Sequence, residues 1–453
     1  MDNILKNYLK LKGDYVIWVI YLLLIMLSVS IFYSAASPLI VDSTQEFIKH
    51  IIFLLLGFGV LMAVYSLPRQ YMKIIAWAML AFAFVLQIAA YTPLGSDDHR
   101  RILFLQPSEI AKFALIVISA YFIDRFQDAD FLRKNFKWFF MIIWVPLLII
   151  IPTNGSMGII IIVPILLMMM IGSIPWKKIR FFIGVPMLIV GVFCAVALMI
   201  PDETYKKYAS PKEQLNAAKV AVNTLSKVRV HTWTNRTANW LDGNMNDEQS
   251  VQARCAIYDG KHPTGPGNSV WRNHIVQGWS DYIFAIIIEE YGIIGAFLVS
   301  LLFLWLLFRA GVLVRQCKTV YSAIVIVGAT TVIIFQAFVH IGVCTGLIPA
   351  TGQPLPLISK GGTSILIISA FFGLMLGMSR EVEDVKNENV PKNNLEKNTE
   401  ENTENIDKKT ETSDEKPEEI LNEKFDEIEK ISDEIIEISE SNDDTAKTIE
   451  IEL

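Results

Sequence analysis

The sequence predicts an all-α, polytopic integral membrane protein with about ten transmembrane helices and one large loop on the outer side. Of its 453 residues, 53% are hydrophobic and 11% are aromatic, an apolar share too high for a soluble fold of this length. The apolar residues gather in runs of about 20, the length that an α-helix needs to cross the hydrocarbon core of a bilayer. Lysine and arginine favour every second loop between the runs, as in multi-pass membrane proteins.

Ten apolar runs mark the predicted helices. The first follows a polar segment, 1–14, and lacks a small-residue cleavage site, so we expect a retained helix rather than a signal peptide. The fifth and sixth runs are divided only by the short stretch 152–156, which contains a proline and a glycine. The predicted spans are residues 15–36, 48–67, 72–92, 107–124, 138–152, 155–174, 179–200, 282–308, 320–347 and 362–379.

The basic residues assign a side of the membrane to each loop. They concentrate in alternate short loops, and the positive-inside rule places these loops and both termini in the cytoplasm. The long segment from about 201 to 281 then lies on the outer face, where a loop of this length is a candidate functional part. The residues that set this topology are Arg69, Lys73, Arg125, Arg133, Lys134, Lys137, Lys177, Lys178, Arg180, Arg309, Arg315 and Lys318.

The C-terminal segment 381–453 differs in composition from the membrane domain, 15–380. It holds 26 Asp and Glu residues against 9 Lys and Arg, a balance of −17; since the whole chain carries −6, the rest carries +11. A segment this acidic and this poor in apolar residues cannot bury enough surface to fold by itself. We expect a disordered cytoplasmic tail.

Charged residues inside apolar runs are functional hypotheses, because an unpaired charge in the membrane is costly. Glu109 and Lys112 stand three residues apart in one run and therefore share a face of the predicted helix. They form either a structural ion pair or part of a polar cavity that holds an anionic ligand. Lys360 stands in a stretch of prolines and glycines, where irregular backbone must be buried in protein or face water. This stretch is either a simple connection or part of a site.

The stretch WSDYIFAIIIEEYG carries three more acids. Asp281 lies where the long outer loop meets the eighth run, and it is either the N-cap of that helix or a reactive group at the outer rim. Glu289 and Glu290 lie about 12 Å deeper, at 1.5 Å per residue, and point to different sides. We expect polar partners for them in the interior. An outward-facing cavity that contains Asp281, Glu109 and Lys112 would suit an enzyme or a carrier.

Three motifs in this order resemble those of the SEDS family of bacterial cell-wall proteins, which comprises FtsW, RodA and SpoVE. They are QPSEIAKFALI at 106–116, GPGNS at 265–269 with SDYIFAIIIEEYG at 280–292, and TGQPLPLISKGGTS at 351–364. The resemblance covers about 14–380 and is strongest to the cell-division branch, FtsW. The chain departs from the family pattern at Asn154, where many members have aspartate, and at His340, where asparagine is common.

This resemblance implies a peptidoglycan glycosyltransferase that polymerises lipid II, the disaccharide-pentapeptide on undecaprenyl pyrophosphate, into glycan strands during septal cell-wall synthesis. Asp281 matches the family's essential acid and would act as general base in an inverting step that forms a β-1,4 bond. The departing pyrophosphate requires positive charge, for which Lys112, Arg101 and Arg236 are the candidates. The residues expected to bind substrate are Glu109, Lys112, Arg101, Arg236, Gln252, Gly265, Gly267, Lys360 and Ser364.

Three other functions fit the same sequence: a carrier that flips the lipid-linked precursor, an elongation polymerase of the RodA type, and a non-catalytic divisome scaffold.

The sequence requires no cofactor, although Mg²⁺ or Mn²⁺ could assist at the pyrophosphate. The four scattered cysteines predict neither a disulfide framework nor a metal site. The resemblance implies a class B penicillin-binding protein transpeptidase and other cell-division membrane proteins as partners. It also implies the bacterial plasma membrane at the septum as the location. Nothing in the sequence indicates nucleic-acid binding.

Overall fold

The computed structural model describes a bundle of helices. Within the described residues the regular structure is helical, apart from one isolated bridge between Ile102 and Leu105. The chain divides into a unit Met1–Val385 and a unit Lys386–Leu453. The helices discussed below belong to the first, except that the last helix ends at Glu388. The described residues are 12–35, 43–90, 92, 102, 105–151, 153–199, 240, 248–275 and 277–388.

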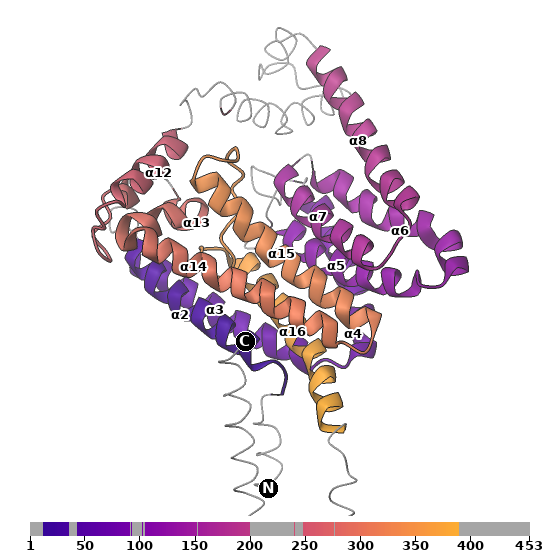
Figure 1. The fold of residues 1–453 in the computed structure, drawn as a ribbon. Helices are drawn as coiled ribbons and strands as arrows, with labels where there is room; N and C mark the ends of the chain where they lie inside the picture. The colour runs from indigo at the N-terminus through magenta and orange to yellow at the C-terminus, as the bar shows by residue number, and fades with distance from the viewer. Residues whose placement is uncertain are drawn as a thin grey trace, which may run out of the picture. The chain divides into compact units, whose positions relative to one another are not determined.

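Ten long helices in this part of the chain follow the ten predicted spans in order (Figure 1). Six of them are long and apolar enough to cross a membrane, namely α2, α3, α4, α14, α15 and α16, and α7 is a shorter apolar helix. The predicted all-α membrane fold is confirmed. The ten helices are α2 (Tyr15–Ala35), α3 (Ser43–Ser66), α4 (Arg69–Ala90), α5 (Pro107–Arg125), α6 (Ala129–Ile150), α7 (Gly155–Ile171), α8 (Trp176–Met199), α14 (Ile283–Gln316), α15 (Val320–Cys344) and α16 (Gly362–Glu388).

Several helices extend beyond the predicted spans. α3 begins at Ser43 rather than near 48, α6 begins at Ala129 rather than 138, and α14 reaches Gln316 rather than 308. The extensions contain charged residues, which an apolar run excludes although a helix can continue through them at the membrane surface. The predicted boundaries therefore mark the edges of apolar sequence and not the ends of the helices.

The central helices of the bundle are α5, α15 and α16. Nearly every side chain of α5 is buried, and most of those of α15 and α16 are buried too. Phe113 of α5 meets Phe371 of α16 with ring centroids 5.3 Å apart, and Phe122 meets Phe139 of α6 at 5.6 Å. A helix that is buried all round contacts protein rather than lipid. Polar side chains of α5 are therefore expected to have protein partners.

Three short helical elements precede α14: α12 (Glu248–Asp259), the 3₁₀ turn η1 (Trp271–Asn273) and α13 (Gly278–Asp281). They belong to the predicted outer loop, of which residues 201–239, 241–247 and 276 lie outside the described part. α12 packs against α14, which runs beside α15 (Figure 1). The Ser250 and Tyr282 hydroxyls form a hydrogen bond of 3.1 Å between them. The described part of this loop is thus folded onto the membrane helices.

α14 is interrupted at Gly292. This residue has φ 70° and ψ −169°, a conformation that side-chain-bearing residues rarely adopt. At a break in a helix, the carbonyl groups of the preceding turn lose the backbone N–H donors of the next turn. Thr264 N–H donates to the carbonyl of Glu289 at 3.1 Å. Gly265 N–H donates to the carbonyl of Glu290, also at 3.1 Å. The interruption therefore lets the outer segment bond to the backbone of α14.

Replacing Gly292 with alanine is expected to destabilise the protein by about 1–3 kcal/mol, the usual cost of a non-glycine residue in such a conformation. The new Cβ would also lie 2.7 Å from Cγ of Pro263. Thermal unfolding of the purified full-length protein in detergent measures the effect. Gly311→Ala in the same helix is the matched control, because its Cβ would meet no atom within 4 Å. An unchanged melting temperature for Gly292→Ala would contradict the assigned backbone conformation.

Candidate active site

Asp281 is the last residue of α13 and lies beside the chain that follows α15. The Ser280 hydroxyl donates to Oδ1 of Asp281 at 2.9 Å. A Cβ on Gly352 would lie 3.3 Å from Oδ2 of Asp281, so the backbone at Gly352 passes close to the carboxylate. The side chain of Asp281 is half-buried. The carboxylate is therefore placed between two parts of the chain that are far apart in sequence.

The interpretation of Asp281 as the N-cap of the following helix is wrong. α14 begins at Ile283, and the N-cap position belongs to Tyr282, whose φ of −133° and ψ of 22° are not helical. The preceding turn, α13, ends at Asp281, so a non-helical residue separates the acid from α14. Helix capping is therefore not the reason for an acid at this position.

The segment 345–361, which we call the re-entrant segment, connects α15 to α16 and carries irregular backbone into the bundle. Its carbonyl groups are bonded by side chains from other elements. The Ser28 hydroxyl of α2 donates to Leu357 O at 2.6 Å. The Gln336 amide of α15 donates to Pro354 O at 2.9 Å. Irregular backbone in a membrane bundle requires such partners, and the segment is consequently fixed to several helices rather than only joining two.

Lys360 brings a positive charge to the same region. Its backbone N–H donates to Trp279 O at 3.1 Å, and its carbonyl accepts from the Ser280 hydroxyl at 3.2 Å. Its ammonium group pairs with the Glu46 carboxylate of α3 and lies 5.6 Å from the centre of the Trp279 ring. The Lys360 side chain is 35% exposed. The structure thus joins Lys360 to the two residues that precede Asp281, and the cation remains accessible.

Glu109 and Lys112 form the ion pair that their spacing predicted. Lys112 Nζ lies 2.7 Å from Oε2 of Glu109, and the two side chains are 1% and 0% exposed. Lys112 also donates to Oε1 of Gln336 at 2.9 Å, and Gln336 is the residue that bonds to Pro354 of the re-entrant segment. A charged pair in the protein interior requires such additional hydrogen bonds. Its burial favours the structural role, and the predicted contact with substrate stays a prediction.

A second polar group fixes the re-entrant segment to α7 and α15. Gln353 donates to Ser156 Oγ at 3.0 Å and to Asn154 Oδ1 at 3.3 Å, both at the start of α7. His340 Nδ1 forms a hydrogen bond of 2.8 Å with the carbonyl of Gln353. Sequence reasoning did not select Gln336 or Gln353. An amide inside an apolar run was the available signal, since a buried amide needs hydrogen-bond partners.

Glu289 fixes η1 to α14. Its Oε1 accepts from the backbone N–H of Val270 at 2.8 Å and of Trp271 at 3.2 Å. The Ser269 hydroxyl donates to Oε2. Three donors on one carboxylate explain how the acid is accommodated in a buried position. The prediction of polar partners for this residue is confirmed.

Glu290 holds the glycines of the GPGNS motif. Its Oε1 accepts from Gly267 N–H at 3.2 Å, and its Oε2 accepts from the Ser34 hydroxyl of α2. Gly265 and Gly267 have φ of 83° and 80°, values that favour glycine. The polar partners predicted for Glu290 are confirmed as well. The structure gives both glycines a place against α14, and their predicted role in substrate binding stays a prediction.

The remaining predicted site residues are placed less closely or not at all. Gln252 lies on α12 and donates to Oε1 of Glu248 at 3.3 Å. Ser364 lies in the first turn of α16 and is buried. Arg101 and Arg236 lie outside the described residues. The contacts of Gln252 and Ser364 do not test their role in substrate binding. For all four residues that role stays a prediction.

The described residues contain no group of three or more His, Cys, Asp or Glu side chains arranged to hold a metal ion. Mg²⁺ at a phosphate site needs less than this, because it keeps several waters and takes one or two carboxylates together with the phosphate oxygens. The half-buried Asp281 and Glu46 carboxylates are donors of that kind. Assistance by a divalent cation stays a prediction.

Buried polar groups from α2, α7 and α15 meet the re-entrant segment, and Lys112 of α5 reaches it through Gln336. Such convergence marks an integral membrane protein with a functional site among its helices. The chain belongs to the FtsW/RodA/SpoVE family, described as cell cycle protein, whose family model matches residues 14–384. The family predicted from the three motifs is thereby confirmed.

Two relatives illustrate the range of the family. The probable peptidoglycan glycosyltransferase FtsW of Enterococcus hirae is 28% identical over 404 residues, which cover 85% of this chain and 97% of that protein. The peptidoglycan glycosyltransferase MrdB of Escherichia coli K12 is 25% identical over 281 residues, which cover 60% of this chain and 67% of that protein. The match to FtsW therefore extends over more of both chains.

Solved structures share the fold. One, from work on the structural coordination of polymerization and crosslinking by a peptidoglycan synthase complex, aligns with a TM-score of 0.56 and 18% identity, covering 82% of this chain and 98% of that chain. The rod shape determining protein RodA of Thermus thermophilus aligns with a TM-score of 0.52 and 18% identity, covering 83% and 98%. At this identity the likeness concerns the fold alone.

Proposed function

We propose that this protein is a peptidoglycan glycosyltransferase that polymerises lipid II into glycan strands during septal cell-wall synthesis. Support comes from the family, from the names of the relatives, and from the fuller match to FtsW than to MrdB. An elongation polymerase of the RodA type is the alternative within the same chemistry. The proposed location is the bacterial plasma membrane at the septum, with both termini in the cytoplasm.

The observation that carries the proposal is the half-buried carboxylate of Asp281, held by Ser280 and lying near Lys360. A sugar hydroxyl is a poor nucleophile until a base accepts its proton. Asp281 would take the proton of the acceptor 4-hydroxyl while that oxygen attacks the anomeric carbon of the donor. The α-linked pyrophosphate then leaves with the bonding electrons, and a β-1,4 bond forms by inversion.

Lys360 would supply positive charge to the leaving pyrophosphate. Its side chain is 35% exposed, whereas that of Lys112 is fully buried. A fixed positive charge stabilises the transition state when it lies where negative charge develops, and this is usually the largest single contribution to catalysis. Arg101, Arg236 and a divalent cation are further candidates for this task. Lys112 would act mainly by fixing the re-entrant segment through Gln336.

The proposed partner is a class B penicillin-binding protein transpeptidase, together with other cell-division membrane proteins. The related synthase complex is described as coordinating polymerization with crosslinking, which supports a transpeptidase as partner. Glycan synthesis and crosslinking are separate reactions, so a chain that performs only the first requires a second protein for the other. The substrate, lipid II, follows from the proposed reaction.

Reconstitution tests the proposed function. The full-length protein and its transpeptidase partner are placed in liposomes with lipid II, and glycan strands are separated by gel electrophoresis. Strand formation that requires this protein is the expected result. The transpeptidase alone is the control. Transfer of lipid II between leaflets without strand formation would instead favour the carrier, and neither activity would favour the scaffold.

A further inference from the structure

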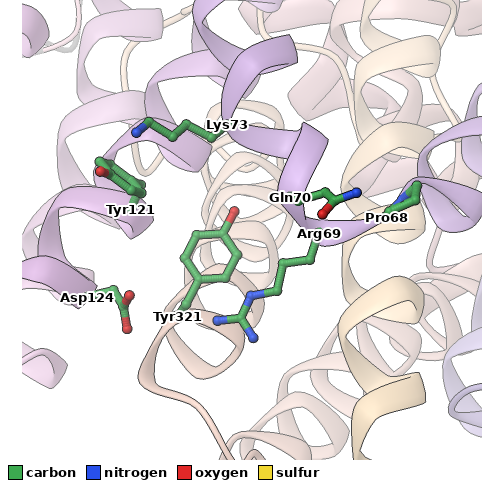
Figure 2. A pocket seen from close by; sticks show the side chains of 7 residues that line it. All are labelled: Pro68, Arg69, Gln70, Lys73, Tyr121, Asp124 and Tyr321. Carbon is green, nitrogen blue, oxygen red and sulfur yellow. The ribbon is translucent and has the colours of Figure 1, made fainter.

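A pocket of about 620 Å³ lies between the start of α4, the last turns of α5 and the start of α15 (Figure 2). α5 begins at Pro107, next to Thr363, whose hydroxyl accepts from Gln106 N–H at 3.1 Å. The last turn of α5 then lies about 20 Å further along the bundle, at 1.5 Å per residue. The pocket is lined by Pro68, Arg69, Gln70, Lys73, Tyr121, Asp124 and Tyr321. It is therefore separate from the candidate active site.

Two cations line this pocket, and aromatic rings hold both of them. Arg69 and Lys73 are four residues apart on α4 and share one face of it. The Arg69 guanidinium lies 4.7 Å from the centre of the buried Tyr321 ring, and Lys73 Nζ lies 4.0 Å from the centre of the Tyr121 ring. A ring contact restricts a flexible side chain and so reduces the entropy lost when it binds a ligand.

The charge pattern specifies the chemistry of the ligand. An Arg–Lys pair suits phosphate oxygens, because the guanidinium donates two parallel hydrogen bonds and the ammonium adds a point charge. Asp124 faces the same pocket and would repel a simple anion (Figure 2). The ligand must therefore also carry hydrogen-bond donors that the carboxylate can accept. A phosphodiester with free hydroxyl groups satisfies both requirements.

The place of the pocket identifies the source of that phosphodiester. The distribution of lysine and arginine puts this end of the bundle on the cytoplasmic side of the membrane. Basic pockets between transmembrane helices at that surface are typical sites for anionic lipid headgroups. A volume of 620 Å³ falls within the range of about 300–1,000 Å³ usual for small-ligand sites.

We propose that this pocket binds the phosphoglycerol headgroup of an inner-leaflet phospholipid. Arg69 and Lys73 contact the phosphate, and Asp124 accepts hydrogen bonds from the glycerol hydroxyls. The site joins α4, α5 and α15 at the membrane surface, and α5 and α15 are the helices that carry Lys112 and Gln336. Occupancy by lipid would therefore stabilise the packing of the two helices that support the active site.

Native mass spectrometry of the full-length protein, titrated with phosphatidylglycerol in detergent, tests this inference. One tightly held phosphatidylglycerol is expected for the wild type, and R69Q/K73Q should bind it roughly 30-fold more weakly, since each cation at the surface contributes about 1 kcal/mol. The matched control, R133Q/K137Q, removes the same charges at the same spacing from exposed positions on α6. It should bind like the wild type, and an equal loss in this control would overturn the proposal.

Two further measurements separate the alternatives. Phosphatidylcholine, which keeps the phosphate but lacks the glycerol hydroxyls, should bind the wild type more weakly than phosphatidylglycerol does, and equally tight binding of the two lipids would overturn the proposal. Glycerol 3-phosphate that binds the wild type as tightly as phosphatidylglycerol would support the phosphate chemistry but overturn the lipid as its source. D124N should weaken the binding of phosphatidylglycerol, whose hydroxyls lose the carboxylate, and strengthen the binding of phosphatidic acid, which the carboxylate repels. Stronger binding of both lipids would overturn the proposed contact between Asp124 and the hydroxyls. Equal melting temperatures of the lipid-free variants show that they are folded.

Discussion

Asp281→Asn is expected to lower glycan polymerisation by about 100-fold or more, the usual scale for loss of a general base. Asparagine keeps the size of the side chain and can still accept the hydrogen bond from the Ser280 hydroxyl. It cannot take a proton from the acceptor sugar. The rate of strand formation from lipid II by the full-length protein with its transpeptidase partner measures the effect. The melting temperature of the variant should match that of the wild type.

The matched control for this substitution is Asp130→Asn, on the exposed first turn of α6. It makes the same chemical change away from the candidate active site and should polymerise normally. Because Tyr282 and not Asp281 occupies the N-cap of α14, no capping defect is expected to confuse the result. Near-normal polymerisation by Asp281→Asn would exclude the general-base role and favour the carrier or the scaffold.

Breaking the buried ion pair of α5 is expected to have the largest effect on stability. Lys112→Met leaves the Glu109 carboxylate without its cation at a site that is 1% exposed. Removing one partner of a buried pair costs about 3–5 kcal/mol, because the other charge stays buried. Glu109→Gln should be costly for the same reason. The double variant Glu109→Gln/Lys112→Met removes both charges and should be more stable than either single variant.

Thermal unfolding and strand formation together separate the two roles of this pair. If Lys112 also binds pyrophosphate, the double variant regains stability but not polymerisation. Full polymerisation by the double variant would exclude a substrate role. Lys49→Met is the matched control for burial, since Lys49 pairs with Glu46 at the same i, i+3 spacing and is 58% exposed. An exposed pair contributes about 0–1 kcal/mol, so this variant should unfold near the wild-type temperature.

The spans could be predicted from the sequence because each helix crosses an apolar solvent and must therefore be apolar along its length. The division between α6 and α7 followed from a proline and a glycine near Asn154. The ion pair of Glu109 and Lys112 followed from helical spacing alone. These are local properties, which one segment of sequence can determine without its neighbours.

The contacts that assemble the candidate site are not local. The proximity of Asp281 to Gly352 depends on how α13 meets the re-entrant segment, and no pattern within either stretch specifies it. The interruption of α14 at Gly292 was missed because the run contains no proline, and its two glycines, Gly292 and Gly295, are compatible with a continuous membrane helix. The N-cap alternative for Asp281 could be excluded only from the structure, in which Tyr282 occupies the N-cap position of α14 and bonds to Ser250 of α12.

The hydrogen bonds made by the re-entrant segment can form only late in the synthesis of the protein. Ser28 on α2, and Asn154 and Ser156 at the start of α7, bond to residues of this segment. A ribosome that adds about 5–20 residues per second needs on the order of tens of seconds to proceed from α2 to 345–361. During that interval these polar groups lie in inserted helices without their final partners. The nascent protein therefore resides in the membrane as an incompletely packed bundle until its last two helices have emerged.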